Sequence, residues 1–489
     1  METANLYLYF NVLILKLFGV SYGSMKLFSA IPGIIVCGAV FLISHLLFSR
    51  RVALWIALLF TFAHWTVRLS RYGWDASFMV MAFSITIWLL LLGMQRGRPL
   101  YTYLAGMTAG LSLYSYQGAR IGVLSLFSFL ALEWVLARDR RIFKHATTFA
   151  AGAVAVAYPL LCYYLSKPSA FWVRIAELSV FNNEHPFTVI VDNVWRHALM
   201  FHALGGTYAR DNFPGLPMMD PLTGLLSIVG LLVLVRSRNL YFARLIGCAF
   251  LLNFIPGIFS VSPEGAPYVY RTAAVMIPAF LITGLGLHQV IHLLERWLRS
   301  YLSLPNIKIL IGSTLALTMA LNLYLYFGLE RKNSAAMRVM AYELRLIGLE
   351  IAQDNLPVIL VGQDILDQSE TDPKPGEKYA QANPPPLVPG PLRSLAVINF
   401  SGRYDLTQSV AYNFTHPRNL YSVDTNSLEA YNPPFQGPVK LILRSRDRQV
   451  WDSIRGQYPS ASVRDVRNIH GEPVLLVAIL PKLYGSRPG

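Results

Sequence analysis

The chain has 489 residues, of which 54% are hydrophobic and only 14% are charged, and its formal net charge is +15. A typical soluble domain carries about a quarter charged residues, so this composition excludes an ordinary soluble protein, an intrinsically disordered chain and a disulfide-stapled scaffold. A membrane protein with several spans and a more polar part remains, and its basic charge is expected in cytoplasmic loops rather than on a surface for nucleic acid.

Apolar segments of spanning length occupy the first two thirds of the chain. A helix needs about 20 predominantly apolar residues to cross a bilayer. We predict about ten spans, some of them short, at 27–48, 52–67, 76–95, 99–116, 119–137, 144–166, 221–235, 240–261, 273–293 and 308–327. The preceding segment 6–19 is apolar but short and carries Lys16, which favours a helix at the membrane interface.

The character of the sequence changes at about residue 330. The runs 357–362, 394–400 and 439–443 have the length and β-branched content of strands, and 446–457 has the pattern of a helix. Residues 368–393 form a proline-rich polar loop between them. The sequence therefore predicts a polytopic α-helical transmembrane domain over 1–329 and a small α/β domain over 330–489.

The distribution of charge predicts the orientation in the membrane. Alternate gaps between the spans are short and basic, such as the gap that holds Arg138, Arg140 and Arg141, and the positive-inside rule places them in the cytoplasm. The long loop 167–220 and the C-terminal domain then lie outside. The same count places Met1 outside, although no signal peptide precedes it. We therefore expect that a first span and a first outer loop are missing, with one miscounted span as the alternative.

The predicted outer gaps hold most of the polar residues that could carry chemistry. They are 68–75 (RLSRYGWD), 114–120 (YSYQGAR), the loop 167–220 and 262–272 (SPEGAPYVYRT). Arginine matches phosphate oxygens in a bidentate geometry, and aromatic rings stack on sugar faces. The combination favours a site for a phosphorylated, lipid-linked substrate. For any single residue, the alternative is a side chain that only reaches the lipid headgroups from the end of a span.

The sequence contains no motif for a metal, a nucleotide or an activated nucleophile. It has no HExxH, Walker, GxSxG or CxxC pattern, and the five-residue spacing of His197 and His202 does not align them on one helix face. No cofactor is therefore assigned, and a divalent metal ion is left open.

The order of the segments resembles a known family. The stretch NLYLYFNVLILKLFGVSYGSMKLFSAIPG and the motifs SRYGWDASF, GLSLYSYQGAR and RDNFPGLPMMDP are similar to bacterial membrane glycosyltransferases of the GT-C fold, glycosyltransferase family 39. This group is related to the dolichyl-phosphate-mannose protein mannosyltransferases and the lipid A aminoarabinose transferases. The resemblance covers about residues 2–330 and implies a multi-pass protein of the bacterial plasma membrane. It implies transfer of a sugar from a polyprenyl-phosphate donor to a protein, lipid or glycan acceptor on the outer face, with inversion at the anomeric carbon.

The resemblance also suggests which residues act. Glu2 and Asp75 match acidic positions of the family and are predicted to be catalytic, although Asp75 could instead cap the span that begins at Ala76. The family's Asp-Glu pair belongs to the first outer loop, the same piece that the charge count predicts to be missing, so a truncated or inactive form is one alternative. Tyr268 stands where some relatives carry histidine, which speaks against a metal there.

We predict further roles for residues in the outer gaps. Arg71, Arg120 and Arg271 are expected to bind the donor phosphate, Trp74, Tyr116 and Tyr268 to contact the sugar or the prenyl chain, and Arg210 and Asp211 to lie on a loop over the site. Residues 187–203 predict an interfacial helix, and the segment 208–220 a cover that excludes water from the reaction.

Two other classes of function remain as alternatives. One is a transporter or flippase for a polar lipid, and the other is a non-catalytic membrane scaffold that presents its C-terminal domain. Transporters place ionisable groups near the bilayer midplane. Here those groups lie at the predicted outer ends of the spans, which favours the glycosyltransferase.

Overall fold

The computed structural model describes most of the first 329 residues and parts of the remainder. The described residues are 6–19, 22–72, 74–237, 240–262, 265–329, 333, 346–347, 350, 353–354, 356, 358–361, 420–423, 437–468 and 470–481. Contacts divide the chain into two compact units, Met1–Ile14 with Lys26–Arg331 and Leu15–Met25 with Lys332–Gly489. Each unit is described by itself.

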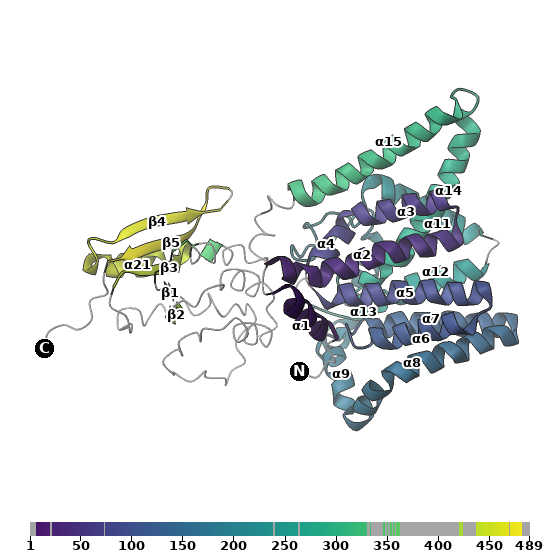
Figure 1. The fold of residues 1–489 in the computed structure, drawn as a ribbon, viewed down its shortest axis with the longest axis horizontal. Coiled ribbons are helices and arrows are strands. Elements are labelled where there is room, and N and C mark those ends of the chain that lie inside the picture. Colours follow the sequence, from purple (N-terminus) through teal and green to yellow (C-terminus); the bar gives the residue numbers. More distant parts are fainter. Residues whose placement is uncertain are drawn as a thin grey trace. The chain divides into compact units, whose positions relative to one another are not determined.

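The first unit is built mainly of helices. Its longer helices are α2 (Tyr22–Leu47), α5 (Asp75–Arg96), α7 (Ala119–Ala137), α8 (Arg140–Ser166), α14 (Met276–Leu298) and α15 (Leu304–Leu323), which continues into the π-helix η3 (Tyr324–Leu329). The shorter ones are α1 (Leu6–Phe18), α3 (Arg50–Phe62), α4 (His64–Tyr72), α6 (Pro99–Ser112), α9 (Pro168–Glu177), α10 (Pro186–Leu199), α11 (Pro221–Arg236), α12 (Leu240–Leu252) and α13 (Ile255–Ile258), with the 3-10 turns η1 (Val180–Asn182) and η2 (Ala273–Val275). Figure 1 shows the long helices running side by side, with α1, α4, α9 and α13 gathered at one end of the bundle.

All ten predicted spans fall on helices, but ten membrane crossings are not confirmed. In the described part of the chain, seven helices are long and apolar enough to cross a bilayer, or eight if α3 and α4, which are bent by 59°, form one span. Helices α6 and α11 have 14 and 16 residues, fewer than the roughly 20 that a crossing needs. The expectation of a short helix near 6–19 is confirmed by α1.

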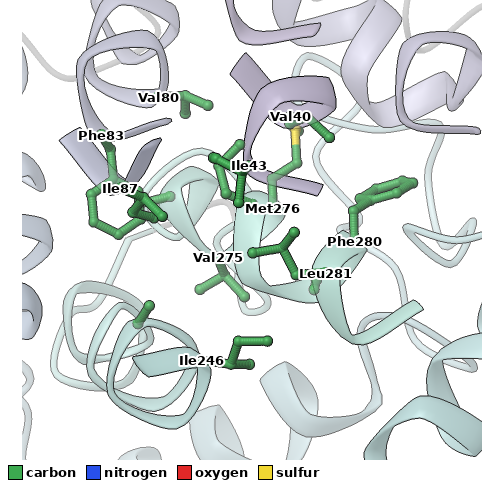
Figure 2. Packing of buried hydrophobic residues seen from close by; sticks show 14 of the residues in the cluster. Val40, Ile43, Val80, Phe83, Ile87, Ile246, Val275, Met276, Phe280 and Leu281 are labelled. Carbon is green, nitrogen blue, oxygen red and sulfur yellow. The ribbon is translucent and has the colours of Figure 1, made fainter. Parts of the chain in front are cut away.

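The centre of the first unit is an apolar core built by helices that are distant in the sequence. Val40 of α2, Val80 of α5, Ile246 of α12 and Met276 of α14 are all buried and lie close together in Figure 2. Because these four helices share one core, the segments between them are brought to common ends of the bundle.

Helices α11 and α14 pack so closely that their backbones touch. A Cβ atom placed on Gly230 of α11 would overlap the carbonyl oxygen of Ile282 on α14, and one placed on Gly286 of α14 would overlap that of Leu226 on α11. Small residues permit such close approach between membrane helices. The α11–α14 pair therefore depends on the absence of side chains at these two glycines.

The second unit contains a five-stranded mixed sheet. Its strands are β1 (Val358–Val361), β2 (Leu420–Val423), β3 (Val439–Arg444), β4 (Ser462–Arg467) and β5 (Pro473–Leu480), in the order β2-β1-β3-β5-β4. Strand β1 is parallel to β2 and β3, and β5 is antiparallel to β3 and β4. Helix α21 (Arg448–Ile454), between the 3-10 turns η6 (Ser445–Asp447) and η7 (Arg455–Gln457), buries Trp451 and Ile454 in one core with Leu441 and Leu476.

The sequence predicted part of this sheet. The strands expected at 357–362 and 439–443 and the helix expected at 446–457 are confirmed by β1, β3 and the segment around α21. The strand expected at 394–400 and the loop 368–393 lie outside the described residues. Strands β2, β4 and β5 were not predicted.

Candidate active site

The candidate site lies at the start of α5, where Asp75 is the first helical residue. Trp74, not Asp75, occupies the N-cap position, so the alternative that Asp75 is the cap does not hold. The Asp75 carboxylate instead accepts a hydrogen bond from the hydroxyl of Tyr270, and that hydroxyl also accepts the backbone N–H of Ala76 (3.4 Å). Tyr270 belongs to the segment that leads into η2, so the core that joins α5 to α14 brings this acid and phenol together.

Aromatic rings from two other segments pack against Tyr270 of this pair. The Tyr270 ring centroid lies 4.2 Å from that of Trp74 and 4.9 Å from that of Tyr116, both in edge-on geometry. Burial raises the pKa of the Tyr116 and Tyr270 phenols above their usual range, and the Asp75 carboxylate acts in the same direction. Both phenols therefore stay protonated near neutral pH, and Tyr270 remains a hydrogen-bond donor to Asp75.

A small cavity adjoins the aromatic cluster. Its volume is about 30 Å³, and it is lined by Trp65, Arg68, Leu69, Trp74, Arg210, Asp211, Val269, Tyr270 and Ala273. The Arg210 guanidinium lies 4.0 Å from the Trp74 ring centroid and forms a two-pronged ion pair with Asp211 (2.8 and 3.2 Å). This volume holds about two water molecules. A sugar ring is larger than this space, so the lining residues must move apart before one can enter.

The structure separates the predicted phosphate ligands. Arg71 is exposed, with its guanidinium 5.2 Å from the Phe327 ring centroid. Arg120 donates to the Phe171 carbonyl and the Tyr164 hydroxyl, both at 2.9 Å. Neither arginine is among the residues that line the described cavity.

Arg271 lies nearer to the site. Its Nη1 donates to the Ser260 hydroxyl (2.5 Å), and its guanidinium lies 4.5 Å from the Tyr268 ring centroid. Its charge also lowers the pKa of Tyr116 against the larger effects of burial and Asp75.

The predicted residues therefore divide into groups. Trp74, Asp75, Tyr116, Arg210 and Asp211 form or adjoin the cluster; Asp75 itself is not among the residues that line the cavity, but it accepts a hydrogen bond from Tyr270, which is. Glu2 lies outside the described residues. The roles predicted for all of these residues stay predictions.

Sequence reasoning missed two members of the site, Arg68 and Tyr270. Both lie in outer gaps that were singled out, but neither was given a role. Arg68 is only 4% exposed, and a charged side chain adjoining an apolar run was the available signal. No signal pointed to the pairing of Tyr270 with Asp75, which are 195 residues apart.

The long loop 167–220 begins with α9 and η1 and continues into α10, which confirms a helix near 187–203. This helix buries polar side chains and exposes apolar ones: Asn193 and His197 are 2% and 1% exposed, whereas Phe187, Val191 and Trp195 are more than half exposed. An apolar outer face fits the predicted contact with a membrane surface. The contact itself is a prediction.

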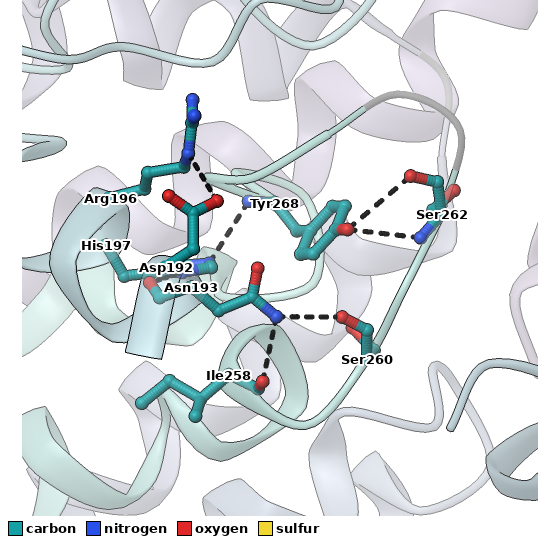
Figure 3. A network of polar contacts seen from close by, with 8 residues as sticks. All are labelled: Asp192, Asn193, Arg196, His197, Ile258, Ser260, Ser262 and Tyr268. Atoms are coloured by element: carbon teal, nitrogen blue, oxygen red, sulfur yellow. Dashed lines mark hydrogen bonds and ion pairs between the residues drawn. The ribbon is translucent and has the colours of Figure 1, made fainter. Parts of the chain in front are cut away.

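A polar network holds the inner side of α10 (Figure 3). Asn193 Nδ2 donates to the carbonyls of Ile258 and Ser260 (2.9 and 3.0 Å). The Nδ1–H of His197 donates to the Asn193 carbonyl (2.7 Å), and its Nε2 accepts the backbone N–H of Tyr268 (3.1 Å). Both nitrogens are used only if the imidazole is neutral.

His197 should therefore make the protein less stable in acid. Burial lowers its pKa to about 4; the Arg271 charge acts in the same direction and the Asn193 carbonyl in the opposite one. The unfolded chain binds this proton near pH 6.5, so stability is lost as pH falls from about 6.5 to 4, by roughly 3 kcal/mol. We expect the heat-denaturation midpoint of the detergent-solubilised protein to fall more steeply over this range than that of His197→Gln. Parallel curves for the two proteins would contradict the prediction.

The described residues offer no evident metal ligands. Among them, no group of three or more His, Cys, Asp or Glu side chains is placed to hold a metal ion. These side chains therefore do not fit the divalent ion that the sequence left open.

A family comparison bears on the class of the protein. Residues 3–163, which are 161 of the 489, match the model of the family described as dolichyl-phosphate-mannose-protein mannosyltransferase. The resemblance to this glycosyltransferase family is confirmed over these residues. Together with the bundle of apolar helices, it indicates a multi-pass membrane protein that is similar to this family over about a third of its length. No curated protein matches the chain in sequence.

Two groups of solved structures are similar to the chain. ArnT from Cupriavidus metallidurans, bound to undecaprenyl phosphate, is 13% identical with a TM-score of 0.49 and aligns over 97% of this chain and 88% of that one. The oligosaccharyltransferase of Archaeoglobus fulgidus, in complex with Zn and sulfate, is 14% identical with a TM-score of 0.43 over 74% of this chain and 52% of that one. Neither TM-score reaches 0.5, so the two structures agree with this chain only in broad outline.

Proposed function

We propose that the protein transfers a sugar from a polyprenyl-phosphate donor to an acceptor on the outer face of the cell membrane. The observation that carries the proposal is the Asp75–Tyr270 pair beside a cavity lined by Arg68, Arg210 and aromatic rings. The family match over residues 3–163 supports the same chemistry. A carboxylate, cationic groups and stacking surfaces are what sugar transfer from a phosphate leaving group requires.

The proposed reaction is a single displacement. The oxygen of the acceptor hydroxyl bonds to the anomeric carbon while Asp75 takes the proton of that hydroxyl. The bond from the anomeric carbon to the donor phosphate breaks at the same time. The phosphate leaves as an anion, and Arg271 is our choice to stabilise it because it directly follows Tyr270 in the chain. Trp74 and Tyr116 would contact the sugar or the prenyl chain. Tyr270 holds the carboxylate in place.

The proposed placement follows the charge pattern. The basic gaps would face the cytoplasm, and the site, the loop 167–220 and the C-terminal domain would lie outside. A membrane-impermeant label applied to intact cells tests this placement, since labelling of the C-terminal domain only after lysis would reverse it.

The activity can be tested in vesicles that contain the purified protein. Polyprenyl-phosphate donors carrying different radiolabelled pyranoses would be mixed with membrane extract as the source of acceptors. We expect label to leave the donor lipid and appear in a second product for at least one sugar. Movement of intact donor between leaflets without its consumption would instead support a lipid transporter. Donor that neither moves nor reacts would support a scaffold.

A further inference from the structure

The bent span formed by α3 and α4 contains an unusual break at Ala63. Neither proline nor glycine lies there, yet Ala63 has ψ 132° and the two helices diverge by 59°. In an unbroken helix the backbone N–H of His64 would bond the carbonyl four residues earlier. It donates instead to Asn322 Oδ1 (3.0 Å), and Asn322 Nδ2 donates to Asp220 Oδ2 (2.8 Å). A side chain from α15 that takes over the free N–H accounts for the bend.

The bend lets α4 hold the loop between α10 and α11 at two points. We name residues 205–219 the site loop. His64 Nε2 donates to the Pro217 carbonyl (3.1 Å), and Arg68 Nη1 donates to the carbonyls of Ala209 (3.2 Å) and Arg210 (3.0 Å). Both side chains are almost fully buried, at 3% and 4% exposure. Hydrogen bonds from a buried charged group to a backbone are among the stronger contacts in a protein.

The site loop carries the side chains that cover the cavity. The Arg210 guanidinium lies 4.0 Å from the Trp74 ring centroid and 4.6 Å from that of Tyr208. Trp74 packs on Tyr270, which donates to Asp75. The hydrogen bonds from the Arg68 side chain to the loop backbone are therefore connected, through Arg210, Trp74 and Tyr270, to the proposed catalytic carboxylate of Asp75.

We propose that Arg68 is a positioning residue. It fixes the backbone of residues 209–210, so that Arg210 and Asp211 lie over the cavity and keep water from the donor. Arg68 acts through the loop, because its Nη1 is engaged by two main-chain carbonyls of that loop. This inference rests on the proposed function, since it assigns to the site loop the exclusion of water from sugar transfer.

The first experiment measures the loop without any substrate. Arg68→Met and Arg68→Gln would be compared with the wild type by hydrogen–deuterium exchange of the whole detergent-solubilised protein. Arg51→Met is the matched control, because Arg51 is exposed at the start of the same bent span. Loss of two charged hydrogen bonds should speed exchange in peptides covering 205–219 by about tenfold or more. Exchange in α5, α7 and α14 of the Arg68 variants should stay at the wild-type rate. In the Arg51→Met variant, exchange should stay at the wild-type rate in all peptides.

The second experiment measures the fate of the donor. In the transfer assay, both Arg68 variants should release more free sugar for each sugar transferred, with the ratio raised about tenfold as the cover loosens. A purely structural defect would lower both products together and leave this ratio unchanged.

The two measurements separate the inference from the proposed function. Wild-type exchange in the site loop of a folded Arg68 variant overturns the positioning role, and so does faster exchange with an unchanged ratio of products. If Arg68→Met does not fold, the same two measurements are made on Arg68→Gln, whose side chain keeps a hydrogen-bond donor but is shorter. Their outcomes test the positioning role in the same way. If the wild type transfers no sugar, the proposed function fails, while the exchange data still show whether Arg68 holds the loop.

Discussion

Replacing Asp75 by asparagine should lower the rate of sugar transfer by about 10²–10⁴-fold, the range found for a positioned general base. Asparagine has the same shape and can still accept the hydrogen bond of Tyr270, but it cannot take the proton of an acceptor hydroxyl. The protein should therefore stay folded and bind its donor. The measurement is the initial rate of transfer in vesicles with the donor at saturation.

Asp192→Asn provides the matched control for this loss. Asp192 is exposed on α10 and forms an ion pair with Arg196 (2.6 Å), away from the proposed chemistry. Exposed pairs of this kind contribute little to stability, so its variant should transfer sugar at the wild-type rate. If Asp75→Asn retains more than about a tenth of the wild-type rate, Asp75 is not the base.

Replacing Gly230 by alanine should destabilise the helical unit by about 1–3 kcal/mol or more, as overpacking in a closely fitted core does. The added methyl group would overlap the carbonyl oxygen of Ile282, so α11 and α14 must move apart. Main-chain atoms cannot rotate aside as the end of a flexible side chain can. We expect a lower heat-denaturation midpoint and a lower yield of monodisperse protein in detergent.

Replacing Gly247 by alanine should leave the stability of the protein unchanged or raise it. Gly247 lies in α12, and no atom outside its neighbours lies within 4 Å of a Cβ placed there. Alanine is favoured over glycine in a helix by about 1 kcal/mol. Gly247→Ala should therefore match or exceed the wild-type midpoint. Equal midpoints for the two alanine variants would show that the α11–α14 contact is not as close as described.

The helices were predictable because their signal is local. Apolar length alone indicated the longer helices of the bundle, and the mixed pattern of 187–203 indicated α10, whereas α9 was not predicted. The number of crossings was less predictable. An apolar run such as 99–116 does not show that its helix ends at Ser112, and a single run at 52–67 does not reveal the bend at Ala63. That bend depends on Asn322, which is 258 residues away from the N–H that it accepts.

The site was predictable only in outline. The outer gaps contained its residue types, and Trp74, Asp75 and Arg210 were named. Which residue meets which was not accessible, because hydropathy indicates depth in the membrane and not direction around a helix. Arg71 and Arg120 illustrate this point: each lies in the right kind of gap, yet each contacts aromatic side chains that do not line the cavity.

The place of β4 in the C-terminal sheet has a consequence for many copies in one membrane. Among the described strands, β4 pairs with β5 alone and forms one border of the sheet (Figure 1). A free border offers unpaired N–H and carbonyl groups to the next molecule, which can lead to aggregation. Strand β4 carries Arg464, Asp465 and Arg467, and its register shifts between Val466 and Arg467. Charge and an irregular backbone both oppose the addition of a further strand, so anchored copies can crowd together without joining their sheets.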